Sequence, residues 1–127
     1  MVQECIVCGN PYSEEHHIVF RGQQEAMINC PLNKKSLCCE CHRGKNGPHL
    51  NRSIDLKYKI ELQEEMYKLF SAKECYSEDE VKIILQIPRK HVRKLLKPLG
   101  LKVLDDTVGY CREDIIKQAM GGKFYGK

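Results

Sequence analysis

The chain has 127 residues, of which 42% are hydrophobic and 30% charged, with eight cysteines, no tryptophan and a formal net charge of +4. This length allows one ordinary domain or two very small ones. No apolar run approaches the roughly 18 residues of a membrane span, and no secretory signal pattern is visible. We therefore expect a cytoplasmic protein with no membrane partner, and not a collagen-like or wholly disordered chain.

Four of the cysteines form two Cys-x-x-Cys pairs, Cys5/Cys8 and Cys38/Cys41. A disulfide scaffold would need an oxidising compartment, so metal binding is the better interpretation in a chain without an export signal. Two residues between thiolates let one turn present both sulfurs to one ion, and two such turns complete a tetrahedron. We predict a structural four-cysteine Zn²⁺ site, with redox use of either pair as the alternative.

The segment around these pairs, residues 1–52, shows short strand-like pieces such as residues 17–20, separated by turn formers. Residues 53–75 follow as one amphipathic helix, with Ser53 as the expected cap. Its apolar residues recur at helical spacing and predict a buried stripe of Leu62, Met66, Leu69 and Phe70. We interpret this helix as a connector that packs on the metal module.

Residues 77–127 read as helices and a hairpin. Ser77 and Glu80 form a capping box for a first short helix. A second helix over residues 89–97 would bury Val92, Leu95 and Leu96 and expose its basic side chains. A hairpin over residues 101–111, turning at 105–107, and a final helix over 113–120 complete the chain.

The net charge lies entirely in this last segment. Residues 1–50 hold five basic and five acidic side chains, residues 51–76 again five of each, and residues 77–127 eleven and seven. Between Glu80 and Asp105 there are seven lysines or arginines and no acid. Such a block favours a polyanionic partner, most simply nucleic acid. A solvated helix face is the alternative.

The order of elements over residues 76–120 resembles the winged helix-turn-helix of excisionase-like and MerR-like DNA-binding domains. The matching stretches are I-P-R-K-H-V at 87–92 and R-E-D-I at 112–115. The resemblance implies a DNA partner, with base edges or phosphates contacted by Arg89, Lys90, Arg93 and Lys94. A small helical bundle used for protein contacts is the alternative.

A second motif lies between and after the cysteine pairs. The run E-H-H-I-V occupies 15–19, Asn33 stands four residues before Leu37, and His42 follows the second pair directly. This combination over residues 5–50 resembles the HNH endonucleases, the zinc-knuckle branch of the ββα-metal nucleases. The longer run over 42–49 is similar to small HNH proteins encoded by phages and prophages. The resemblance implies hydrolysis of DNA phosphodiester bonds with a catalytic divalent cation, Mg²⁺, Mn²⁺ or another.

Adjacent residues on a strand point to opposite sides, so His16 and His17 are expected to do different jobs. The resemblance implies that His17 is the general base, a task that suits histidine. It also implies that His16 and His42 bind the catalytic cation and that Asn33 orients the base.

A third cation ligand has two candidates. Asn46 would share a helical face with His42 if the helix continued, whereas glycines that end the helix would let His49 turn back toward the site. Arg21 and Arg43 are candidate phosphate contacts, because guanidinium matches phosphate bidentately.

Taken together, these patterns predict an α+β protein: a small zinc-stapled ββα-metal module (1–52), a linking helix (53–75) and a winged helix-turn-helix domain (76–127). The expected function is a metal-dependent HNH endonuclease acting on DNA. The alternatives are a non-catalytic zinc-containing DNA-binding regulator of phage or host genes and, more weakly, an RNA-directed role. The oligomeric state is left open, although cutting both strands would favour a dimer.

Overall fold

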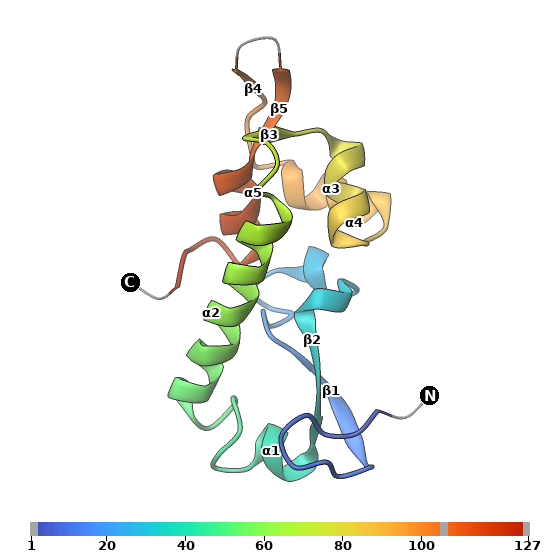
Figure 1. Ribbon diagram of the computed structural model, residues 1–127, viewed down its shortest axis with the longest axis vertical. Coiled ribbons are helices and arrows are strands. Elements are labelled where there is room, and N and C mark those ends of the chain that lie inside the picture. Colours follow the sequence, from blue (N-terminus) through green and yellow to red (C-terminus); the bar gives the residue numbers. More distant parts are fainter. Residues whose placement is uncertain (1–2, 105–106, 126–127) are drawn as a thin grey trace.

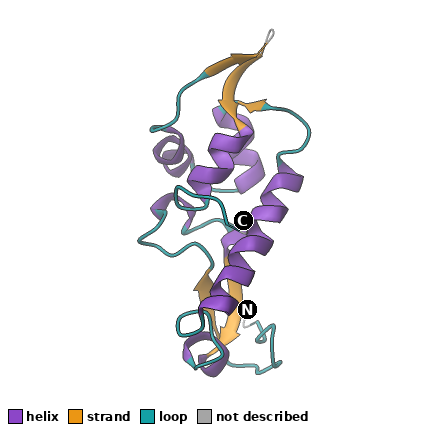
Figure 2. Ribbon diagram, turned by 90° about the vertical axis from the view of Figure 1, so that its left-hand side faces the viewer, coloured by secondary structure: helices purple, strands orange, loops and turns teal. Residues whose placement is uncertain are grey.

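The computed structural model describes residues 3–104 and 107–125 as an elongated molecule with a small sheet toward each end (Figures 1 and 2). At one end, β1 (Ser13–His17) pairs antiparallel with β2 (Lys34–Cys38), and α1 (Cys39–Arg43) follows directly. The long helix α2 (Arg52–Leu69) runs from there toward the other end. The α+β class is confirmed.

Strand β1 stops at His17 because the following backbone has another partner. The side chain of Asn33 takes both the N–H and the carbonyl of Val19, which removes these groups from strand pairing. The prediction that the strand continues through residues 18–20 is therefore wrong. The connection to β2 instead contains two single 3₁₀ turns, η1 (Glu25–Met27) and η2 (Pro31–Asn33).

Helix α2 begins and ends earlier than predicted. Asn51, not Ser53, is its cap, because the Asn51 side-chain oxygen accepts the N–H groups of Ser53 and Ile54. Of the predicted stripe, Leu62, Met66 and Phe70 are buried, whereas Leu69 is 37% exposed. No helix within residues 3–104 and 107–125 is both long and apolar enough to cross a membrane.

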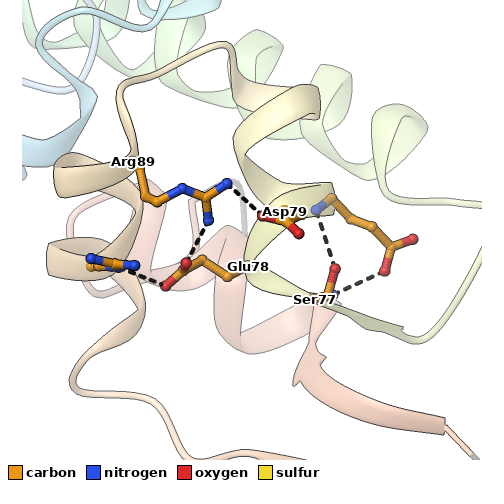
Figure 3. Close-up of polar contacts among 6 residues, drawn as sticks. Ser77, Glu78, Asp79 and Arg89 are labelled. Atoms are coloured by element: carbon orange, nitrogen blue, oxygen red, sulfur yellow. Dashed lines mark hydrogen bonds and ion pairs between the residues drawn. The ribbon is translucent and has the colours of Figure 1, made fainter.

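The capping box of Ser77 and Glu80 is confirmed, with both of its hydrogen bonds present (Figure 3). Strand β3 (Cys75–Tyr76) was not predicted; it joins a three-stranded sheet of order β3-β5-β4. The predicted turn at residues 105–106 lies outside the described residues. The remaining elements are α3 (Glu78–Leu85), α4 (Arg89–Leu96), β4 (Lys102–Leu104), β5 (Thr107–Cys111) and α5 (Arg112–Ala119).

One hydrophobic core runs through the three predicted segments. Met27 of η1, Met66 of α2, Leu95 of α4 and Ile116 of α5 all belong to a single cluster of buried side chains. Turn η1 packs on α4, and α2 packs on α5. The boundaries at residues 52 and 76 therefore follow the chain but do not separate independent cores.

This shared core gives a first prediction. A fragment of residues 1–76, supplied with Zn²⁺, is expected not to fold, because it would expose the faces of Met27, Met66 and Phe70, which are 0% exposed in the whole chain. Burying each such side chain is worth about 1.5–3 kcal/mol, against a total stability of about 5–15 kcal/mol. An amide ¹H–¹⁵N spectrum checks it: dispersed peaks from the fragment, like those of the full chain, would contradict a shared core.

Candidate metal centre and catalytic residues

The four cysteines of the two predicted pairs come together in space. Cys5 and Cys8 lie in an N-terminal turn, and Cys38 and Cys41 lie at the junction of β2 and α1. Their sulfurs are all within 4.8 Å of one another, and those of Cys8 and Cys38 are 3.6 Å apart. A tetrahedron with Zn–S bonds of about 2.3 Å has sulfurs about 3.8 Å apart. This cluster could therefore hold a metal ion such as zinc.

Backbone donors favour the thiolate form of Cys5, whereas neighbouring thiols raise the pKa of Cys8 and burial raises that of Cys41. Burial raises the pKa of Cys5, but backbone N–H groups of the two turns outweigh it and lower that pKa to about 6. The backbone N–H of Cys41 donates to the sulfur of Cys38 at 3.4 Å. Gly9, directly after Cys8, has φ +78°, the left-handed conformation that lets the first turn close. Thiolate is the form that binds metal.

A second cluster is formed by His16, His42 and His49, whose ring nitrogens lie within 4.8 Å of one another. His16 is 1% exposed, and its buried Nε2 has no hydrogen-bond partner in the described part of the chain. An unpaired buried nitrogen is costly, so this one suits a ligand. Burial, followed by the neighbouring His42 and His49, lowers the pKa of His16 to about 3. The ring is therefore neutral at neutral pH, as a metal ligand must be.

Glu14 orients His42 within this cluster. A carboxylate oxygen of Glu14 lies 2.6 Å from Nδ1 of His42, and the same carboxylate accepts Arg43 at 2.8 Å. The bond from His42 and the charge of Arg43 lower the pKa of Glu14. With Nδ1–H donated to a carboxylate, the lone pair of His42 lies on Nε2, which is 2.9 Å from Nε2 of His49. Metal-binding histidines commonly have such a carboxylate behind them.

Glycines determine where the two candidate third ligands, Asn46 and His49, lie relative to His42. Helix α1 ends at Arg43 with Gly44 as its cap, so Asn46 falls in an exposed turn and not on the face of His42. A Cβ on Gly47 would lie 2.5 Å from the carbonyl oxygen of His42, so only glycine lets the chain return this closely. The structure thus brings His49 to the cluster, where its ring stacks on Phe20 with centroids 5.2 Å apart.

His17 lies outside the three-histidine cluster. His17 follows His16 directly on β1, so it projects from the other face of the strand. The Nε2 atom of His17 is 3.1 Å from the carbonyl oxygen of Ile28. Donation of Nε2–H to that carbonyl leaves the lone pair on Nδ1. Asn33 holds the same loop: fully buried, it accepts the N–H of Val19 at 2.7 Å and donates to Met27, next to Ile28, at 3.1 Å.

Most of the predicted DNA contacts are engaged within the protein. Arg89 donates to Glu78 and Asp79 at 2.6 Å each (Figure 3). Arg93 reaches Glu78 at 3.3 Å, and Lys94 reaches Glu25 at 2.8 Å. Three basic side chains of the acid-free stretch are therefore paired with acids that precede it in the sequence. Arg43 is held by Glu14, while Arg21 and Lys90 are exposed.

Glu14 is the site residue that sequence reasoning missed. Its signal was present, because Glu14 and His16 are two apart on a strand and so share a face. The sequence does not show, however, whether the strand extends back as far as Glu14, and the alternation applies only within the strand. The structure separates Glu14 from its neighbour: Glu14 contacts His42, whereas Glu15 is exposed and pairs with Lys34.

The chain matches no known protein family, no curated protein and no solved structure. The resemblance to HNH nucleases and to winged helix-turn-helix domains therefore rests on the motifs and their placement alone. The geometry itself supplies a four-cysteine cluster that could bind metal and, beside it, a three-histidine cluster.

The cysteine cluster gives a second prediction, which also tests the register of the second pair. Cys8→Ser is expected to weaken Zn²⁺ binding by more than about 100-fold. Mutating residues that only hydrogen-bond to metal ligands already lowers metal affinity by about 10–100-fold. Cys39→Ser is the matched control, because exposed Cys39 adjoins the pair but is outside the cluster. Titration with a competing chelator measures both affinities. Loss of zinc from Cys39→Ser, with Cys8→Ser unaffected, would contradict this ligand set.

Proposed function

We propose that this protein is a metal-dependent DNA endonuclease of the HNH type. The observation that carries the proposal is the convergence of His16, His42 and His49, with Glu14 behind His42, in a cluster separate from the four cysteines. One of the three ligands, His49, is exposed. Three protein ligands would leave the fourth position of a tetrahedral metal free, as in catalytic sites, whereas a structural site is closed by four.

A divalent cation at this cluster would supply positive charge to the phosphate as the reaction proceeds. Three imidazoles suit zinc, nickel or iron better than magnesium, which prefers oxygen ligands. The donor set thus narrows the earlier expectation of Mg²⁺, Mn²⁺ or another divalent cation. We expect a transition metal to support the activity best.

His17 is the general base in this proposal. Its Nδ1 carries the lone pair that takes a proton from the attacking water, since Nε2–H is donated to the carbonyl of Ile28. After the transfer, the same carbonyl stabilises the positive ring, because it accepts a stronger, charge-assisted hydrogen bond. Asn33 acts indirectly, by holding the loop that carries this carbonyl.

DNA is the proposed partner, and α4 is the element proposed to contact it. The ion pairs of Arg89 and Arg93 with α3 are on the surface, where such pairs contribute about 0–1 kcal/mol. Phosphates can therefore compete with Glu78 for these arginines. The regulator hypothesis keeps the same DNA-binding helix but assigns the histidines no chemistry.

A nicking assay is the third prediction and tests the proposed function. The full chain is incubated with supercoiled plasmid and, in turn, Zn²⁺, Ni²⁺, Co²⁺, Mn²⁺ or Mg²⁺. His17→Ala is expected to lower the nicking rate by about 10²–10⁴-fold, the usual contribution of a general base. Glu64→Gln is the control, because Glu64 is exposed on α2 and belongs neither to the three-histidine cluster nor to α4.

No nicking with any of these metals would favour the regulator. A His17→Ala variant that nicks as fast as the intact protein would remove His17 from the mechanism. Single-stranded DNA and RNA substrates in the same assay separate the DNA proposal from an RNA-directed role.

The charge arrangement gives the fourth prediction. Replacing Glu78 and Asp79 by Gln and Asn frees Arg89 and Arg93, and is expected to tighten DNA binding by about two- to tenfold with a steeper salt dependence. Glu64→Gln with Glu65→Gln, on exposed positions of α2, makes the same change in net charge. Fluorescence anisotropy at several salt concentrations measures both. Equal tightening by the two pairs would show that net charge, and not α4, is responsible.

A further inference from the structure

The carbonyl that orients His17 belongs to a turn that the distant C-terminal helix holds in place. Ile28 ends η1, with its N–H donated to the carbonyl of Glu25. Gln24 begins the same turn: its side-chain oxygen accepts the N–H of Ala26 at 3.2 Å. The nitrogen of that amide donates to the carbonyl of Gln118 at 2.9 Å. One amide therefore joins η1 to α5, 94 residues away.

Other contacts hold η1 from the same side. Ala26 and Met27 are fully buried, and the turn packs on α4. Lys94 of α4 pairs with Glu25 at 2.8 Å. Asn33 also holds this turn, because it donates to the carbonyl of Met27. Ile28 directly follows Met27 in the chain.

Of the contacts that join η1 to the C-terminal helices, the one made by Gln24 is best suited to fix the turn. The pair of Lys94 with Glu25 is more than half exposed on both side chains, so it is weak and mobile. Gln24 is less exposed, uses both ends of one rigid amide, and acts on the turn itself. A shift of the turn would move the Ile28 oxygen away from Nε2 of His17, because Ile28 is the C-terminal cap of η1.

We propose that Gln24 is a positioning residue for His17: by tying η1 to α5 it keeps the Ile28 carbonyl where it selects the Nε2–H tautomer. This rests on the proposed function for its catalytic meaning, but the tautomer itself is a structural property. It also gives the C-terminal segment a role in the reaction, beyond contact with nucleic acid.

The substitution Gln24→Glu tests this link. It keeps an oxygen that can cap η1 and replaces the donor toward Gln118 by a second acceptor. Gln63→Glu is the matched control: the Gln63 amide also donates to a C-terminal backbone carbonyl, that of Tyr125, at 2.9 Å. That tie joins α2 to the tail and does not involve η1. Gln24→Met, uncharged and of similar length, is the second variant if the carboxylate prevents folding.

Two measurements are made on the full-length, zinc-loaded protein. The ¹⁵N shifts of the His17 ring report its tautomer, with the signal assigned by its loss in His17→Gln. Plasmid nicking reports kcat and KM separately. We expect Gln24→Glu to move His17 from the Nε2–H toward the Nδ1–H tautomer and to lower kcat by roughly tenfold with little change in KM, as expected of a misplaced base. Gln63→Glu is expected to change neither.

The outcomes separate the two proposals. An unchanged His17 tautomer in Gln24→Glu and Gln24→Met overturns the positioning role, even if the wild type nicks DNA. An equal change in Gln63→Glu also overturns it, because the effect would then be general destabilisation. A tautomer shift specific to Gln24, in a protein that nicks no DNA, supports the positioning role and refutes the proposed function.

Discussion

The buried amide of Asn33 is the contact on which the arrangement of the candidate site depends. It satisfies both backbone groups of Val19 and the carbonyl of Met27, and it is itself fully buried. Each buried group left unpaired would cost about 1–3 kcal/mol, so these bonds strongly fix the local chain path. They end β1 directly after the two histidines and lead the chain into η1. The path of the chain from His17 into the loop that carries the Ile28 carbonyl therefore depends on this side chain.

The alternation along β1 then sorts the chemistry onto two faces. Glu14 and His16 share the face toward α1, where His42 and His49 complete a cluster of neutral or hydrogen-bonded imidazoles. His17 is on the other face, beside the loop that Asn33 holds. A metal ligand needs both a neutral ring and close neighbours, whereas a base needs access to water and an oriented lone pair. Two adjacent histidines on a strand can meet both requirements.

Local signals predicted the parts of the molecule that short-range physics determines. The Cys-x-x-Cys spacing, the capping box at Ser77 and the apolar face of α4 depend on residues within one or two turns, and all appear as expected. One error is local, since the cap of α2 is Asn51 and not Ser53, but others involve partners far away in the chain. The count of charges between Glu80 and Asp105 predicts a basic α4 surface. Glu25, which lies 69 residues before Lys94, nevertheless pairs with that lysine. Strand β3 is equally invisible, because two residues carry no periodicity.

The shared core changes how binding and chemistry would be connected. The sequence suggests one segment that binds DNA and another that cuts it, yet α4 packs directly on η1, and η1 presents the carbonyl that faces His17. Cores are close-packed and transmit small displacements. A displacement of α4 on DNA binding would therefore reach η1, whose residue Met27 is fully buried. The ion pair of Lys94 with Glu25 joins the same two elements. It would be broken if a DNA phosphate bound Lys94. The proposed DNA-binding helix is thus also part of the support of the proposed base.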